Sequence, residues 1–426
     1  MKTNIKFFGF SYFLICILPI LLISGPFISD LTATYLGLSF LLYCIYTKKT
    51  YCFKNKIFLY FIIVYLYLNI NSFFSFNYTI SLKSSLSFLR IILFTIAVAF
   101  FVNKFEQLNK YYFTIFFVSV IFLFLYSYFI IFFKQDFFGN KTLESARITS
   151  FFGSEEIMGS YISRLLPLAV GLSYLINIKH KKKIIYSLFI LSGILILLSG
   201  ERLSLFFFIF FLFFYLILDI KKHIYIILIF FISLGAVYLS NPKSIDRHLF
   251  HTLDQIKSTS NTYLSFRHTL HYITAYEMFL DKPITGHGLK SFRNLCDKFT
   301  KKTDILIYKT NLNNQSNKKI VNEYPNGCNT HPHNIYLEFL SELGIIGFFL
   351  FSSIFVYVAY QLFCLLKLII FSRQILSNNN KCLFLILAGI FITMFPALPS
   401  GSYFNNWMLI ISYLPIGFYF GIKSLK

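Results

Sequence analysis

The sequence predicts an all-α membrane protein that crosses the bilayer many times, and three observations support this prediction. Hydrophobic residues make up 57% of the 426 residues and charged residues only 13%, whereas a soluble domain contains about 25% charged residues. The apolar residues form long runs, and most short basic segments lie between these runs. Mean hydropathy is +0.67. A water-soluble globular protein is therefore excluded.

Several apolar runs approach the roughly 20 residues that a transmembrane helix needs. The first run has basic residues in front of it, as a secretory signal has. No small-residue cleavage site follows it and further runs do, so we expect it to remain as the first helix. We expect about 12 transmembrane helices, near residues 7–24, 31–47, 57–75, 85–102, 111–133, 157–178, 184–200, 203–220, 223–240, 344–371, 382–397 and 406–422.

Alternate connections between these runs are rich in lysine and arginine. By the positive-inside rule, the basic connections face the cytoplasm, and both termini are then cytoplasmic. The same distribution accounts for much of the formal charge of +22, so we expect no nucleic-acid partner. The basic connections contain Lys48, Lys49, Lys54, Lys56, Lys104, Lys110, Lys179, Lys181, Lys182, Lys183, Lys221, Lys222, Arg373 and Lys381.

One long connection, residues 241–333, lies on the opposite face and carries seven of the nine histidines. It separates residues 1–240, with nine expected helices, from residues 334–426, with three. Within it we expect an amphipathic helix that rests on the membrane domain and ends at Asp281-Lys282-Pro283. Its apolar face consists of Tyr263, Phe266, Leu270 and Ile273. Residues 300–327 lack periodicity and are expected to form a surface loop.

The long connection also holds two of the seven cysteines, Cys296 and Cys328. The other five fall in apolar runs or on the cytoplasmic side. Because disulfides form in oxidising compartments, the sequence predicts a bond between Cys296 and Cys328.

Basic residues from four segments meet the same outer face: Arg147, Arg202, Arg267 and His333. An arginine inside a membrane costs about 2.5–3.5 kcal/mol on insertion scales, so it usually faces a cavity or a charged partner. A guanidinium can bind a phosphate through two hydrogen bonds. The alternatives are a snorkelling Arg202 paired with Glu201, an ordinary loop cation at Arg147 and a solvated interfacial cation at Arg267.

His331-Pro332-His333-Asn334 places an imidazole at the membrane surface. The two histidines look like a metal pair, but a metal needs three or four ligands and no partner follows at helical or turn spacing. The outer face also lacks paired acids, so we expect no metal and leave neutralisation of a diphosphate to arginines. The alternatives are a His333 bonded to a nearby carbonyl and an Asn334 that caps a helix.

Glycines near this segment have structural interpretations. We assign Gly344 and Gly347 to close packing of transmembrane helices. Gly286-His287-Gly288 is interpreted as a tight turn, because no buried strand precedes it and no third glycine follows as a phosphate loop requires.

His333-Asn334, nine residues and then Gly344-x-x-Gly347 resemble the signature of the O-antigen ligase family. The resemblance extends over roughly residues 140–350, with Arg202 and Arg267 the next most specific positions. It implies a GT-C-like membrane fold in the bacterial inner membrane, with catalytic elements in a long periplasmic loop. Many members have Ser-Gly-Ser-Arg where this chain has Ser199-Gly200-Glu201-Arg202, which puts an acid beside the expected phosphate-binding arginine.

The resemblance implies a glycosyltransferase that moves a glycan from undecaprenyl diphosphate to the lipid A-core oligosaccharide, with inversion and without ATP, metal or cofactor. Arg202 and Arg267 would stabilise the leaving diphosphate, and Arg147, Asn334 and His331 would bind substrate. His333 would take the proton of the acceptor hydroxyl, a role that suits an imidazole with an ordinary pKa near 6.5.

Three alternatives remain. An O-antigen polymerase shares the broad family and uses a second lipid-linked glycan as acceptor. A protein O-oligosaccharyltransferase often carries an additional soluble C-terminal region, and this sequence ends at Lys426. A polysaccharide-lipid flippase belongs to another class, and it would spread its charges along a central path. All of them act among membrane lipids.

Overall fold

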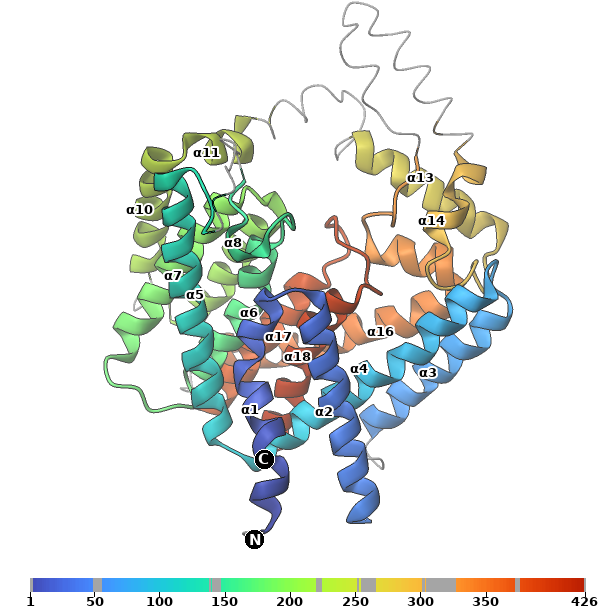
Figure 1. Cartoon of the computed structure of the whole chain (residues 1–426), viewed down its shortest axis with the longest axis horizontal. Coiled ribbons are helices and arrows are strands. Elements are labelled where there is room, and N and C mark those ends of the chain that lie inside the picture. Colours follow the sequence, from blue (N-terminus) through green and yellow to red (C-terminus); the bar gives the residue numbers. More distant parts are fainter. Residues whose placement is uncertain are drawn as a thin grey trace, which may run out of the picture.

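The computed structural model describes residues 3–48, 56–137, 139, 147–219, 224–250, 253, 266–300, 303, 327–371 and 376–424. Of these, residues 3–8, 226, 229, 266 and 267 are described by their backbone alone. Within these ranges the regular structure is helical and no strand is present. The all-α prediction is therefore confirmed for the described residues (Figure 1).

A helix overlaps each of the twelve expected membrane runs. Six helices are long and apolar enough to cross a bilayer: α2 (Pro26–Tyr46), α3 (Lys56–Phe73), α4 (Tyr78–Lys104), α5 (Gln107–Phe133), α7 (Lys181–Ser199) and α16 (Ile335–Phe371). Shorter apolar helices lie in α1 (Thr3–Ile23), α8 (Arg202–Leu218), α10 (Tyr225–Ser240) and α17 (Asn378–Thr393). With α6 (Met158–Leu172) and α18 (Asn406–Lys423), they complete the overlap. The number of twelve spans remains a prediction.

Three of the helices that begin before the apolar run that predicted them, α4, α16 and α17, have a capping side chain at the start. Asn77 accepts a hydrogen bond from the backbone N–H of Ile80 at 3.1 Å and caps α4. Ser377 accepts one from Asn380 at 3.2 Å at the start of α17. Asn334 accepts one from Tyr336 at 3.0 Å at the start of α16. A capping side chain satisfies free N–H groups, so a helix can begin in polar sequence that hydropathy assigns to a loop.

Small residues bring α2 and α18 close to α4. A side chain at Gly37 of α2 would place its Cβ 2.9 Å from Cβ of Leu93 on α4. On α18, a Cβ at Gly417 would lie 2.8 Å from Cβ of Val98, and one at Gly421 would lie 2.7 Å from the carbonyl oxygen of Ala99. Glycine at such positions lets membrane helices pack backbone to backbone.

The helix α16 is broken at Gly344, whose φ of 65° and ψ of −168° are not helical. The predicted turn at Gly286-His287-Gly288 fits against this break. The N–H of Ile345 donates to the carbonyl of Pro283 at 2.8 Å, and the N–H of Gly288 donates to that of Glu342 at 2.8 Å. The assignment of Gly344 to packing between transmembrane helices is therefore wrong, because the segment that approaches it closely is this turn.

The end of the molecule opposite the two termini carries short helices (Figure 1). They are η2 (Ser150–Phe152), α11 (Pro242–His248), α13 (Phe266–Asp281), α14 (Phe292–Leu295) and η3 (Cys296–Phe299). We call this end the α13 end. The expected amphipathic helix is α13, which ends at Asp281 as predicted and packs on α16. Tyr263 and most of the expected surface loop, residues 301–302 and 304–326, lie outside the described residues.

Candidate functional site

A cavity of about 1090 Å³ is lined by segments that are far apart in the sequence. Its wall includes the α1–α2 turn, residues before and in α6, the start of α8, α13, and the connection between α17 and α18. The acids among its lining residues are Glu155 and Glu156, and its basic and histidine residues are Arg147, Arg164, Arg202, His268, Lys290, Arg293, His331 and His333. The cavity is thus strongly cationic.

Four of the residues expected from sequence line this cavity together: Arg147, Arg202, His331 and His333. For Arg267, the structure describes only the backbone, in the first turn of α13, so the position of its guanidinium lies outside the described part. His268, the next residue in the chain, lines the cavity. The convergence of arginines and histidine on one space is present for the described side chains.

Asn334 is 9% exposed and is not among the residues that line the cavity. Its Oδ1 accepts the backbone N–H groups of Tyr336 at 3.0 Å and Leu337 at 3.1 Å. Its Nδ2 donates to the carbonyl of Pro396 at 2.9 Å. These contacts are those of a helix cap, which was the alternative to a substrate contact, and they also attach the start of α16 to the segment after α17.

Arg147 forms an ion pair with Glu156, and its Nε donates to the carbonyl of Ser199 at 3.4 Å. Burial, followed by the positive charge of Arg247, lowers the pKa of the Arg147 guanidinium from its ordinary value. Glu156 therefore balances the charge of Arg147, as the loop-cation interpretation expects.

The acid beside Arg202 stabilises the neighbouring helix. Glu201 is 8% exposed. Its carboxylate accepts the backbone N–H groups of Gly159 at 2.6 Å and Ser160 at 3.0 Å, and the hydroxyls of Ser160 at 2.7 Å and Ser204 at 2.9 Å. Burial raises the pKa of Glu201, and the hydrogen bonds from Ser160 and Ser204 oppose this rise. A carboxylate at the N-terminus of α6 interacts favourably with the helix dipole.

His333 lies in a cluster of four histidines. Its ring centroid is 4.2 Å from that of His331, 5.3 Å from that of His268 and 5.4 Å from that of His271. The backbone at His333 has a φ of 58°, and its carbonyl accepts the N–H of Ser400 at 2.8 Å. The α17–α18 connection therefore helps to hold this residue in an uncommon backbone conformation.

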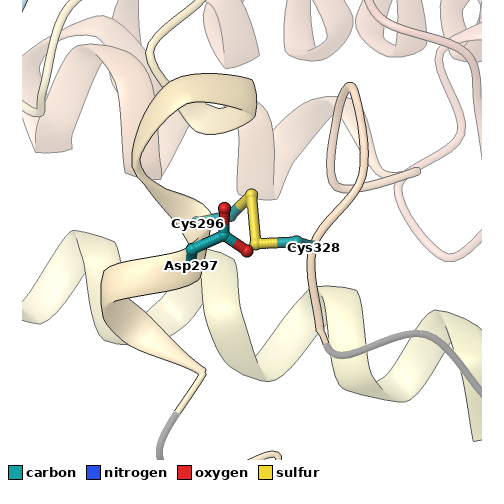
Figure 2. A group of neighbouring side chains, drawn as sticks. All are labelled: Cys296, Asp297 and Cys328. Carbon is teal, nitrogen blue, oxygen red and sulfur yellow. A yellow bond between two sulfur atoms is a disulfide. The ribbon is translucent and has the colours of Figure 1, made fainter.

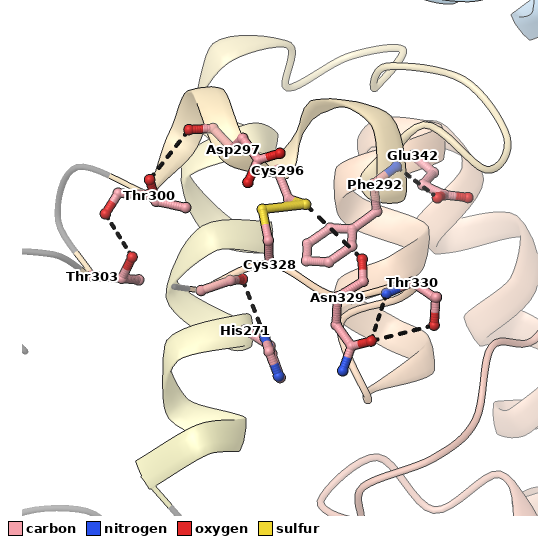
Figure 3. The surroundings of a disulfide bond; sticks show 11 residues. His271, Phe292, Cys296, Asp297, Thr300, Thr303, Cys328, Asn329, Thr330 and Glu342 are labelled. Carbon is pink, nitrogen blue, oxygen red and sulfur yellow. Dashed lines mark hydrogen bonds between the residues drawn. A yellow bond between two sulfur atoms is a disulfide. The ribbon is translucent and has the colours of Figure 1, made fainter. Parts of the chain in front are cut away.

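Asn329 contacts the imidazole of His333 directly, because its Nδ2 lies 3.0 Å from Nε2 of that ring. The Oδ1 of Asn329 accepts the N–H of Thr330 at 2.7 Å, which fixes the amide orientation (Figure 3). The amide nitrogen must then donate to Nε2, so a neutral His333 carries its proton on Nδ1.

His331 is held uncharged. Burial, opposed by a hydrogen bond at Ser400 and assisted by the charge of Arg293, lowers the pKa of His331 to about 4. Its Nδ1 lies 3.0 Å from the hydroxyl of Thr330. His271 is fully buried, and its Nδ1 lies 3.1 Å from the carbonyl of Gly327. Since a carbonyl can only accept, Nδ1 of His271 carries a proton.

Cys296 and Cys328 form a disulfide, and their Cα atoms are 5.2 Å apart (Figure 2). It joins η3 to the segment that leads into the histidine cluster, next to His271 on α13 (Figure 3). Among the described residues, the group that comes close enough to share a metal ion is Cys296, Asp297 and Cys328. Two of these three side chains are bonded to each other, so this set does not fit a metal.

Two buried acids in the first turns of α16 were not predicted from the sequence. Glu338 accepts the hydroxyl of Ser402 at 2.6 Å and the N–H of Tyr403 at 2.8 Å. Glu342 accepts the N–H groups of Lys290 at 2.7 Å and Phe292 at 3.1 Å (Figure 3). Each acid ties a segment of the cavity wall to α16. Two acids four residues apart at the start of an apolar helix were the available signal.

Three cations of the cavity were also missed, namely Arg164, Lys290 and Arg293. Arg164 lies in the middle of the apolar run 157–178, and an arginine in such a run is itself a signal of function. Lys290 and Arg293 lie in polar sequence, where nothing distinguishes them from other surface cations.

Residues 187–352 match the model of the family described as O-antigen ligase, and this range contains Arg202, Arg267, His333 and Asn334. No curated protein matches the chain. Members of the matched family are membrane glycosyltransferase-like enzymes. The match supports the O-antigen ligase family for this chain, in agreement with the signature at His333-Asn334.

Proposed function

We propose that this protein transfers a glycan from undecaprenyl diphosphate to a sugar hydroxyl of the lipid A-core oligosaccharide, as an O-antigen ligase. The observation that carries the proposal is the single cavity in which Arg147, Arg202 and His333 meet, within a chain that matches the family. A donor with a diphosphate needs cations, and an acceptor hydroxyl needs a base. This cavity offers both.

Arg202 is the proposed contact to the diphosphate, together with Arg267, whose side chain is not described. The acceptor oxygen attacks the anomeric carbon, and the bond from that carbon to the diphosphate oxygen breaks. The leaving undecaprenyl diphosphate keeps the electron pair, and guanidinium groups stabilise the charge that develops on it. One direct displacement inverts the anomeric centre.

His333 is the proposed base, and Nε2 is the atom that takes the proton from the acceptor hydroxyl. In the structure Nε2 accepts a hydrogen bond from Asn329, so the hydroxyl replaces the Asn329 amide there. The neutral His331 lies beside His333, with ring centroids 4.2 Å apart, and Arg293 lines the same cavity. Such a base contributes about 10²- to 10⁴-fold in rate.

The orientation belongs to the same proposal. We place the α13 end and residues 241–333 in the periplasm, and both termini in the cytoplasm of a cell with this protein in its inner membrane. The division of residues 1–240, 241–333 and 334–426 follows from this orientation. The alternation of basic connections with connections that carry few basic residues supports it.

The acceptor is tested by a choice of substrates. The family covers ligases and related polymerases, so purified protein is given lipid-linked glycan with and without lipid A-core. Product that depends on the core supports a ligase. Longer glycan on the carrier lipid, formed without the core, indicates a polymerase instead. A flippase would form neither product.

The central experiment is His333→Ala in this transfer assay. We expect transfer to fall at least about 100-fold while donor binding persists. The matched control is His180→Ala, because His180 is exposed and lies at the start of α7. Full activity in His333→Ala contradicts the proposed base. Transfer that survives EDTA supports a mechanism without a divalent ion, and loss of transfer that Mg²⁺ restores contradicts it.

A further inference from the structure

Arg164 is a buried cation in the middle of α6. Arg164 is only 4% exposed. Its Nε and Nη1 atoms are buried and have no hydrogen-bond partner within the described part of the chain. The guanidinium carbon lies 5.0 Å from the ring centroid of Phe207 on α8, and the residue lines the cationic cavity.

Among the residues that the structure describes, no acid forms a hydrogen bond with Arg164. Glu201 is the acid whose charge acts on it. The carboxylate of Glu201, however, accepts four hydrogen bonds from Gly159, Ser160 and Ser204. A buried charge without a hydrogen-bonded partner destabilises a fold, and inside a membrane such residues serve substrates or ions. The missing partner is therefore an anion that enters from the cavity.

The surroundings of Arg164 indicate how deep that anion lies. Arg164 also lines a small inner cavity of about 20 Å³ with Ser400, Tyr403 and Met408. Ser400 and Met408 line the large cavity as well. Arg164 thus lies where the large cavity meets the interior of the helix bundle. Phe207 contacts the face of the guanidinium, which leaves the N–H groups at its edge for an acceptor.

We propose that Arg164 forms an inner phosphate subsite, which binds the diphosphate of the lipid-linked donor in addition to Arg202. The inference rests on the proposed function, because it names a further residue for the same donor. Hydrogen bonds from the guanidinium to phosphate oxygens satisfy the buried Nε and Nη1 atoms, which have no partner among the described residues. The ligand chemistry is a diphosphate, either attached to a polyprenyl chain or free as pyrophosphate.

The test is thermal unfolding and direct binding with full-length protein in detergent. The probes are farnesyl diphosphate, farnesyl monophosphate and inorganic pyrophosphate. In Arg164→Met, which keeps the contact with Phe207, we expect unchanged or higher stability without ligand and at least about tenfold weaker binding of farnesyl diphosphate. Arg164→Lys retains the charge and should bind with intermediate affinity. Equal losses for pyrophosphate identify the diphosphate itself as the ligand, whereas a loss for the farnesyl compounds alone overturns the phosphate subsite.

A structural role for Arg164 predicts the opposite pattern, with lower stability of Arg164→Met and unchanged affinity, and this pattern overturns the inference. Arg90→Met is the matched control, because Arg90 is a membrane-helix arginine with a partner, Asp30, at 2.9 Å. That variant should lose stability and keep its affinity.

Arg202→Gln separates this inference from the proposed function. If farnesyl diphosphate binds neither the native protein nor any variant, the proposed donor is wrong. If Arg202→Gln weakens binding while Arg164→Met binds like the native protein, the proposed donor stands and the inner subsite fails.

Discussion

At the scale of single residues, the state of His333 depends on Asn329. In Asn329→Asp, the carboxylate accepts a hydrogen bond from an Nε2–H group, so the ring proton moves from Nδ1 to the nitrogen that we propose as the base. Transfer should then fall by about 100-fold. Asn329→Ala removes the amide donor from Nε2 and should stay within about tenfold of the native rate. Activity of Asn329→Asp together with inactivity of Asn329→Ala, measured as initial rates at pH 7.5, would assign the base to Nδ1 instead.

His331 gives a prediction about stability and pH. Because burial lowers the pKa of His331 to about 4, the unfolded protein, with an ordinary histidine pKa near 6.5, binds more protons between these values. The stability from this residue is present above pH 6.5 and is lost as pH falls toward 4. His331→Gln should therefore lose less melting temperature between pH 7.5 and pH 5 than the native protein. An equal loss in both proteins would show that other groups cause it.

At the scale of elements, the break in α16 positions the cavity wall. The first turns of α16 hold Glu338 and Glu342, which bind the segments at Tyr403 and Phe292. The break depends on Gly344, where φ is 65° and an added Cβ would overlap the carbonyl of Ile284. Without the break, α16 would continue straight, and the turn at Gly286 could no longer pack against Gly344.

Gly344→Ala should therefore destabilise the protein by about 1–3 kcal/mol, the usual range for backbone strain at such a position. Donor binding should weaken as the turn moves. The control is Gly235→Ala on α10, since nothing lies within 4 Å of a Cβ there. Denaturation in detergent measures the stability of both variants. Unchanged stability of Gly344→Ala would mean that α16 can straighten without cost.

At the scale of the whole molecule, both termini lie at the end opposite α11 and α13 (Figure 1). This arrangement agrees with an even number of spans. Reporter fusions after residue 48 and at the C-terminus should both report the cytoplasm, and a fusion within residues 301–326 should report the periplasm. A C-terminal fusion that reports the periplasm would exclude twelve spans and the proposed orientation of the cavity.

The sequence by itself determined the membrane class, the helical fold and the presence of a helix at each expected apolar run, because hydropathy and charge act on each segment locally. It also indicated Arg147, Arg202 and His333 as candidate site residues, since cations and an imidazole are conspicuous at the ends of apolar runs. The helix start at Asn77 escaped it, and the cap at Asn334 was only an alternative there, because a cap is a local hydrogen bond that composition does not reveal.

Only the tertiary structure decided which of these side chains meet and which are already satisfied. It joined Arg164 and Arg202, on neighbouring helices, to His333 from a segment more than 100 residues later. It also paired Arg147 with Glu156 and engaged Glu201 with the start of α6. The physical reason is that a charge inside a membrane is stabilised by its partners. Those partners come from other helices, and no single segment of sequence encodes how these helices approach one another.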